Sequence, residues 1–264
     1  MALEATRIIL LFDPEHLTAA NFRKKRLVTI QKEVTGGFTN TLTTAAQQEL
    51  QFLNSILTSP LHRQSKSPTL WYHRYWLFSN LLLTTTLYDP FNELYDLLVK
   101  SEFDAVFKAG EQHPKNYYAW QYARRLIELL MSISQQSETQ SNRVQLDVQD
   151  IVNISATRVK DWCLRHPSDT SGWSFLLFVL GCVGNLPTRK DIISNILDLT
   201  FGFRWQHESL WAFIRTALSD PSILADGQAP FVERLYGYEK ERDNYTTSVS
   251  TALQWIETNK TTVP

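Results

Sequence analysis

Residues 113–130 read His-Pro-Lys-Asn-Tyr-Tyr-Ala-Trp-Gln-Tyr-Ala-Arg-Arg-Leu-Ile-Glu-Leu-Leu. Pro114 ends any helix that precedes it, because proline lacks the amide hydrogen that a helix interior requires. Asn116 is a favourable N-cap, so we predict a helix after it. One broad face of that helix carries Tyr117, Trp120, Arg124, Leu126 and Ile127. Weaker copies of this stretch recur along the chain, and the recurrence decides the fold.

The composition is that of a helical protein with a sizeable core. The chain has 264 residues, of which 43% are hydrophobic and 20% are charged. A chain of this composition can bury a core and is not disordered in bulk. Aromatic residues make up 12%, while only 9 residues are glycine. Few glycines and many large side chains favour helices packed on helices over a turn-rich sheet.

The charge pattern and the cysteines exclude several classes of protein. The net charge is −1 and acids accompany the bases throughout, so no nucleic-acid surface is predicted. Cys163 and Cys182 lack ligand-like spacing and further partners, so we predict no metal site in this chain and a reducing compartment. The longest apolar run, 173–184, is far shorter than the ~20 residues that a bilayer requires. The apolar run 8–12 is too short for a secretory signal core, so we expect a cytoplasmic protein without stable membrane insertion.

Proline-marked breaks divide the chain into alternating helices. We expect helices within 14–35, 42–57, 69–85, 89–109, 117–130, 144–164, from 170, from 187, from 207, and one or two within 231–257. Thr18, Thr41 and Asp89 are the expected N-caps of three of them. The polar, low-complexity residues 134–142 are expected to form a surface loop.

A tryptophan near the start of a helix returns at long intervals. The helix heads are Trp71, Trp120, Trp173 and Trp211, spaced 49, 53 and 38 residues apart, with Ala20 in the same slot 51 residues before Trp71. A period in this range with two helices per unit is typical of an α-solenoid. We therefore predict an all-α fold, an α-α superhelix of about five helical hairpins, forming a single domain over residues 1–264.

Four of the five heads are followed, three or four residues on, by an arginine on the same face of the helix. These arginines are Arg23, Arg74, Arg124 and Arg215. The simplest interpretation is that each tryptophan fills the gap between stacked hairpins and each arginine binds carbonyls or acids of a neighbouring hairpin. A row of arginines on one edge of the stack is equally suited to a partner protein or an anion. The sequence leaves both roles open for the arginines.

Three segments resemble the repeats of protein prenyltransferase α subunits. They are Asn116-Tyr117-x-x-Trp120, Pro68-Thr69-Leu70-Trp71-x-x-Arg74 and Glu208-Ser209-Leu210-Trp211. The resemblance covers about five repeats over residues 12–219. It is nearest to the shorter, repeat-containing branch, which resembles the α subunit of the third type of geranylgeranyltransferase.

The resemblance implies a crescent of hairpins wrapped around an α/α-barrel β subunit. In that family the β subunit carries the zinc and most of the isoprenoid pocket. The complex transfers a farnesyl or geranylgeranyl group from an isoprenoid diphosphate to a cysteine near the C terminus of a protein substrate. This division agrees with the lack of plausible zinc ligands here, because such a chain does not activate a thiol alone.

The resemblance also assigns roles to individual residues. Lys115 matches the family lysine that reaches the departing diphosphate, where an ammonium group offsets developing charge. The alternative is a solvated lysine at a helix start, where the dipole disfavours a cation. Tyr117 matches a tyrosine near the same pocket, and its alternative role is packing against Trp120 or the next hairpin. The residues expected to face the β subunit or substrate are Asn116, Trp71, Arg74, Trp120, Arg124, Trp211 and Arg215.

Departures from the family pattern support a different function. Leu176 and Leu177 stand where the fourth repeat of the family has arginine and tyrosine, and Ala123 occupies the arginine slot of the third repeat. These residues favour a non-catalytic helical-repeat scaffold, similar in use to tetratricopeptide arrays. The residues 115–117 favour the enzyme.

Overall fold

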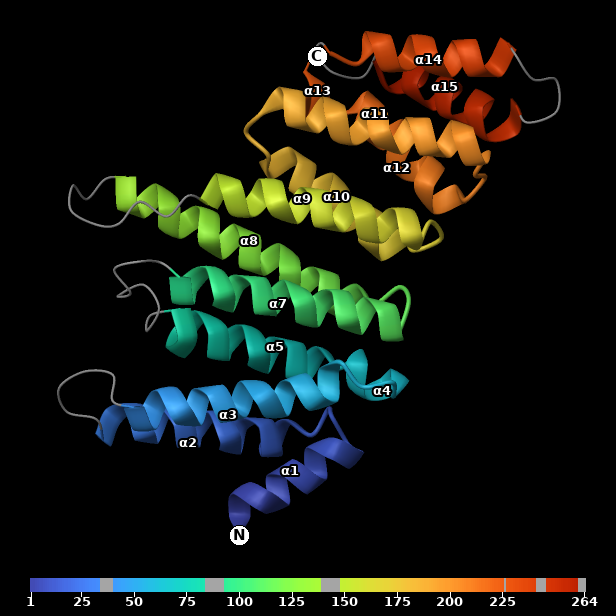
Figure 1. The fold of residues 1–264 in the computed structure, drawn as a ribbon. Coiled ribbons are helices and arrows are strands. Elements are labelled where there is room, and N and C mark those ends of the chain that lie inside the picture. Colours follow the sequence, from blue (N-terminus) through green and yellow to red (C-terminus); the bar gives the residue numbers. More distant parts are fainter. Residues whose placement is uncertain (34–39, 84–92, 139–147, 226, 241–245, 261–264) are drawn as a thin grey trace. The chain divides into compact units, whose positions relative to one another are not determined.

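A computed structural model describes residues 1–33, 40–83, 93–138, 148–225, 227–240 and 246–260 (Figure 1). No strand occurs among these residues, and their helices confirm the all-α prediction. Contacts divide the chain into two compact units, Met1–Leu146 and Asp147–Pro264. Each unit is described by itself, and the single continuous solenoid over 1–264 stays a prediction.

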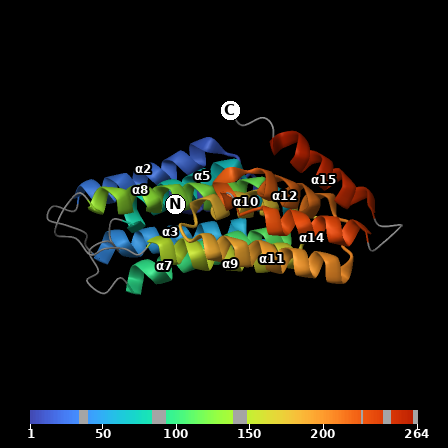
Figure 2. The same ribbon diagram turned by 90° about the horizontal axis from the view of Figure 1, so that it is seen from above.

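The first unit consists of helical hairpins with one further helix at its start. Its helices are α1 (Ala2–Phe12), α2 (Leu17–Glu33), α3 (Asn40–Leu57), α4 (His62–Ser65), α5 (Pro68–Leu77), the π-helix η1 (Phe78–Leu82), α7 (Glu93–Gln112) and α8 (Tyr117–Glu138). Helix α5 packs against α2, α3 and α8, and α7 packs against α8. Figure 2 shows α2, α5 and α8 in one layer and α3 and α7 in a second. The helices headed by Ala20, Trp71 and Trp120 therefore share a layer, as expected for stacked hairpins.

The second unit repeats this plan. Its helices are α9 (Val148–Arg165), α10 (Thr170–Cys182), α11 (Leu186–Phe203), α12 (Glu208–Ser219), α13 (Pro221–Leu224), α14 (Ala229–Lys240) and α15 (Thr246–Lys260). Helix α9 packs against α10 and α11, while α12 packs against α10 and α15. The helices headed by Trp173 and Trp211 are therefore neighbours.

The head tryptophans lie between successive repeats. All four are only 2–3% exposed. The ring of Trp71 lies 5.1 Å from that of Tyr122, and Trp173 lies 5.0 Å from Phe213. Tyr122 and Phe213 each stand two residues after the next head, so the same contact recurs in both units. The prediction that tryptophan fills the gap between hairpins is confirmed.

A π turn extends α5 without a break. In η1 the backbone bonds span five residues, so the turn is wider than an α turn. Leu81, Leu82 and Leu83 follow one another in sequence, and all three are buried. In an α-helix successive side chains point about 100° apart around the axis, so a surface helix rarely buries three consecutive residues. The wider turn of η1 is what lets these three leucines face the interior together.

Several predicted boundaries are wrong. Helix α8 continues to Glu138, so the first part of the predicted loop 134–142 is helical. Buried Leu130 and half-buried Ile133 carry the inward face of α8 into that polar stretch. Helix α7 ends at Gln112 rather than 109, and Asp89 lies outside the described residues.

Two predicted caps are also wrong, and three helices, α1 and the short α4 and α13, were not expected. Thr18 and Thr41 lie inside α2 and α3. His16 caps α2 instead, because its Nδ1 accepts a hydrogen bond from Ala19 N at 3.2 Å. The apolar run 8–12, considered above only as a signal core, is part of α1.

Replacing Gly172 by alanine should destabilise the protein. A Cβ at this position would lie 2.6 Å from Cζ3 of Trp162, which is fully buried and cannot move aside. We expect Gly172→Ala to lower the free energy of unfolding by roughly 1–3 kcal/mol, the usual cost of overpacking. Urea denaturation followed by circular dichroism measures the change.

Gly202 in α11 provides the matched control. A Cβ there meets nothing within 4 Å. Gly202→Ala should therefore raise stability by up to about 1 kcal/mol through helix propensity. Equal effects from the two substitutions would contradict the packing described for Trp162.

Candidate functional site

Four of the five repeat helices share one capping arrangement, and the helix headed by Trp211 has no side-chain cap bond. The cap residue stands four positions before the head tryptophan, and its side chain accepts from a backbone amide of the first turn. The bonds are Leu70 N to Ser67 Oγ at 3.1 Å, Ala119 N to Asn116 Oδ1 at 3.3 Å and Gly172 N to Asp169 Oδ1 at 2.9 Å. His16 holds the same position four residues before Ala20. The predicted N-cap role of Asn116 is confirmed.

The head tryptophan closes the turn that enters its own helix. Its indole Nε1 donates to the carbonyl six residues earlier in three repeats. The bonds are Trp71 to Ser65 O at 2.8 Å, Trp173 to Pro167 O at 3.0 Å and Trp211 to Trp205 O at 2.9 Å. At the third repeat the corresponding carbonyl, that of Pro114, accepts from Lys66 Nζ at 3.1 Å. The third head is therefore joined to the repeat before it.

The cap side chains also join one repeat to the next. Ser67 Oγ donates to Pro14 O at 3.0 Å. Asn116 Nδ2 donates to both the carbonyl and the hydroxyl of Ser65, at 3.1 and 3.0 Å. These bonds run from each head to the turn of the preceding repeat, two residues before its cap. The loop that carries Lys115 is thereby fixed to the rest of the first unit.

Lys115 and Tyr117 lie at the exposed tip of this loop. The backbone of Lys115 is left-handed, with φ of 59°. Tyr117 is 58% exposed and Tyr118 is 40% exposed, with their rings edge to face at 5.4 Å. Gln121 Nε2 donates to the Tyr117 hydroxyl at 3.0 Å. More than half of the Tyr117 side chain faces solvent, so burial against Trp120 or the next hairpin does not account for most of its surface.

Two of the repeat arginines are buried and bind glutamates from the neighbouring helix layer. Arg74 is fully buried, and its Nε and Nη2 donate to Glu102 Oε2 and Oε1 at 2.6 and 3.0 Å. Arg23 binds Glu49 in the same bidentate way, at 2.8 and 2.5 Å. The interpretation that the repeat arginines bind acids is confirmed for these two, although each glutamate lies on the next helix of the same repeat and not in a neighbouring hairpin.

A third residue from the following repeat completes each pair. The Tyr122 hydroxyl donates to Glu102, and His73 Nε2 lies 3.1 Å from Glu49 Oε1. His73 and Tyr122 both stand two residues after a head, so the two triads occupy equivalent positions. Each triad joins three helices, α2, α3 and α5 in one case and α5, α7 and α8 in the other. We call them the first and second triads.

Burial and charge set the protonation states in the first triad. Burial raises the pKa of Glu49, but hydrogen bonds from His73 and Arg23 outweigh it and hold that pKa below its usual value. Burial lowers the pKa of His73, although Glu49 opposes the change, and the charges of Lys24 and Arg23 lower it further. The triad therefore combines a guanidinium, a carboxylate and a neutral imidazole. It is suited to structural cohesion rather than to proton transfer with a substrate.

Burial corrects part of the predicted partner-facing set. A direct contact with a partner needs exposed atoms, and five of the seven residues are buried. They are Asn116, Trp71, Arg74, Trp120 and Trp211. In this structure these five side chains join the hairpins. Arg124 is half-buried, and Arg215 pairs with Glu208 at 2.8 Å and lies over Trp255 at 5.4 Å.

The glutamates were missed by sequence reasoning. Glu49 and Glu102 follow their arginines by 26 and 28 residues. Both lie on the inward, apolar faces of their helices, where an acid needs a partner. The sequence could have indicated them, because each is an acidic residue on the otherwise apolar face of a predicted helix.

Neither a metal-binding cluster nor a membrane-spanning helix occurs in the described part of the chain. Within the described ranges, no three His, Cys, Asp or Glu side chains come together in a way that could hold a metal ion. Nor does any helix of those ranges combine the length and apolarity needed to cross a membrane.

Comparisons with known proteins agree with the repeat pattern. Residues 75–193 match the model of the ECM9 middle domain. The chain is 26% identical over 206 residues to protein prenyltransferase alpha subunit repeat-containing protein 1 of Homo sapiens, covering 74% of this chain and 43% of that protein. It is 26% identical over 215 residues to protein 1-A of the same name from Xenopus laevis, covering 75% of this chain and 41% of that protein. The predicted resemblance to prenyltransferase α repeats is confirmed, and the chain spans about two fifths of the length of these relatives.

Removing the guanidinium of the second triad should be costly. Arg74→Met leaves the buried Glu102 charge without its main partner, so we expect a loss of roughly 3–5 kcal/mol in unfolding free energy. The double variant Arg74→Met, Glu102→Leu should recover most of that loss. Arg63→Ala, which breaks an exposed pair with Asp13, should cost less than about 1 kcal/mol. A loss at Arg74 no greater than at Arg63 in urea denaturation would refute the assignment.

Stability should fall as the pH drops below the usual His pKa of 6.5, because burial lowers the pKa of His73 in the native state. Below pH 6.5 the unfolded chain binds a proton at His73 that the native chain does not bind, which favours unfolding. We expect the unfolding free energy to fall more steeply between pH 7 and 5 in the native protein than in His73→Gln. The other histidines are common to both proteins, so parallel curves would contradict the burial of a neutral imidazole.

Proposed function

We propose that this chain is the α-repeat subunit of a heterodimeric, cytoplasmic protein prenyltransferase. The complex would transfer a farnesyl or geranylgeranyl group from its diphosphate to a cysteine near the C terminus of a protein substrate. The similarity to prenyltransferase alpha subunit repeat-containing proteins supports the repeat part of this proposal. The zinc and most of the isoprenoid pocket would be supplied by a β subunit.

The backbone at Lys115 is the observation that carries the proposal. A left-handed conformation costs a non-glycine residue about 1–2 kcal/mol. Lys115 adopts it at an exposed position where glycine or asparagine would fit with less strain. Strain retained on a loop that its neighbours hold in place is a mark of functional positions. We therefore infer that the side chain of Lys115 is kept for its chemistry, at a position where glycine would relieve the strain.

The chemistry available at the loop tip fits a departing diphosphate. The Lys115 ammonium would offset the negative charge that develops on the leaving oxygens. Tyr117 lies two residues away with an exposed side chain that includes a phenolic donor. The anchors at Asn116 and Pro114 would hold both groups in place before the substrate binds, which reduces the cost of ordering them.

A second candidate function is a non-catalytic interaction scaffold. The burial of Leu176, at the family arginine position of the fourth repeat, favours it. So does the full burial of Arg74, which leaves its guanidinium no access to a ligand. A scaffold would keep the helical stack without any role for Lys115.

Co-expression with each prenyltransferase β subunit of the host separates the two functions. The enzyme predicts a stable pair that transfers a labelled isoprenoid to a protein with a C-terminal cysteine. In that pair Lys115→Gly should reduce turnover roughly 10²–10³-fold, the usual cost of one donor to a developing charge. The same variant should unfold at an equal or higher urea concentration, because glycine relieves the strain.

Controls locate the point of failure. Lys108→Ala removes an exposed lysine from the neighbouring α7 and should leave turnover unchanged. A protein that captures no β subunit would support the scaffold. A pair in which Lys115→Gly retains full turnover would overturn only the role of Lys115.

A further inference from the structure

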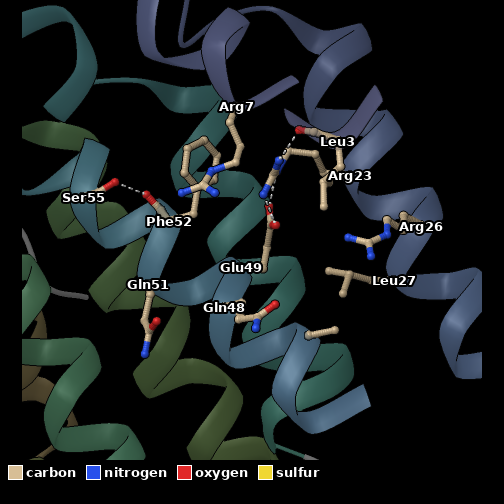
Figure 3. A pocket seen from close by; sticks show the side chains of 11 residues that line it. Leu3, Arg7, Arg23, Arg26, Leu27, Gln48, Glu49, Gln51, Phe52 and Ser55 are labelled. Atoms are coloured by element: carbon tan, nitrogen blue, oxygen red, sulfur yellow. Dashed lines mark hydrogen bonds and ion pairs between the residues drawn. The ribbon is translucent and has the colours of Figure 1, made fainter. Parts of the chain in front are cut away.

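A cavity of about 450 Å³ lies between α1, α2 and α3 in the first unit (Figure 3). It is distant in sequence from the loop tip of Lys115 and is not used by the function proposed above. Its lining comes from Leu3, Arg7, Arg23, Arg26, Leu27, Ala45, Gln48, Glu49, Gln51, Phe52 and Ser55.

The charge of this lining is positive. Three guanidinium groups and one carboxylate line the cavity, which gives a formal charge of +2. Arg23 is occupied by Glu49, by the carbonyl of Leu3 at 3.3 Å and by the hydroxyl of Thr6 at 3.1 Å. The Arg23–Glu49 pair is therefore part of the wall, and the excess positive charge belongs to Arg7 and Arg26.

Arg7 and Arg26 are available to an anion. Arg26 is exposed and pairs with no carboxylate of the described part of the chain. Among the described residues Arg7 pairs with Glu4, at 3.5 Å and with both side chains more than half exposed, and such surface pairs contribute little. Figure 3 shows Arg7 and Arg26 on opposite sides of Arg23. An anion beside either of them would gain a charge-assisted contact.

The rest of the lining suits a peptide rather than a free phosphate. Leu3 and Ala45 are half-buried and line the cavity, so apolar atoms remain at its surface. The ring of Phe52 is buried beneath the guanidinium groups of Arg23 and Arg7, which lie 4.2 and 5.5 Å from its centre. Gln48 and Gln51 supply amide donors and acceptors of the kind that bind a peptide backbone. The carboxylate of Glu49 would repel a dianionic phosphate more strongly than a single carboxylate.

We propose that this cavity binds an acidic peptide segment. A glutamate or aspartate side chain of the ligand would contact Arg7 or Arg26, with a neighbouring apolar side chain against Leu3 and Ala45. The peptide backbone would bind the two glutamine amides. This site is independent of prenyl transfer and serves either function considered above.

The test uses the whole chain and two short peptides, acetyl-Leu-Glu-Leu-Asp-amide and its uncharged counterpart acetyl-Leu-Gln-Leu-Asn-amide. Binding is followed by NMR of the arginine Nε–H groups, which detects weak complexes. The acidic peptide should shift the signals of Arg7 and Arg26 and bind at least tenfold more tightly than its counterpart. Arg26→Gln should weaken the acidic peptide at least tenfold.

Lys25→Gln is the matched control, because Lys25 is exposed on the same helix but does not line the cavity. It should change the affinity less than twofold. Equal losses at Lys25 and Arg26 would overturn the proposal, since they would show non-specific attraction to a basic helix. Equal binding of the two peptides, or displacement of the acidic peptide by inorganic phosphate at a lower concentration than by acetate, would overturn it as well.

Discussion

A helix that begins inside a stack must satisfy its first amides without water, and the repeats are built around that requirement. In four of the five repeats the cap residue four positions before the head accepts from the first turn, and in three the indole closes the turn before it. In Ser67 and Asn116 the same side chain also donates to the preceding repeat. One short segment thus starts a helix and also fixes the register of that helix along its axis relative to the preceding repeat. Because a buried donor without a partner costs about 1–3 kcal/mol, a slip of one residue would be penalised at several bonds at once.

The triads fix the second layer of the first unit. A buried ion pair contributes little net stability, since desolvation offsets most of the attraction. The main effect of the pair is on geometry, because a bidentate bond forms only in a few relative positions of the two helices. A third donor from the next repeat limits these positions further. Ala123 and Leu176 hold the corresponding slots in the third and fourth repeats and carry no guanidinium.

The sequence predicted the features that depend on local pattern and left out those that depend on register between helices. The tryptophan intervals, the cap at Asn116 and the burial of the heads follow from period and capping preference. The pairing of Arg74 with Glu102 does not, because it depends on how two helices lie against each other across 28 residues. The left-handed backbone of Lys115 and the exposure of Tyr117 were equally out of reach, since the loop is shaped by bonds to Ser65 and Lys66 of another repeat. For the same reason a residue type expected at an interface, such as Trp211, turned out to belong to the core.

The π turn after α5 has a consequence for how this stretch can vary over time. An ordinary surface helix offers a solvent-facing position in every turn, where drift is nearly neutral. Leu81, Leu82 and Leu83 offer none, because the widened turn directs all three into the interior. Amino-acid substitutions at these positions are confined to apolar side chains of similar volume. A polar side chain there would lose its hydration without gaining a hydrogen bond, which destabilises the fold. Such a segment is expected to evolve slowly whatever the protein's activity, so slow change there reports on packing and not on a ligand.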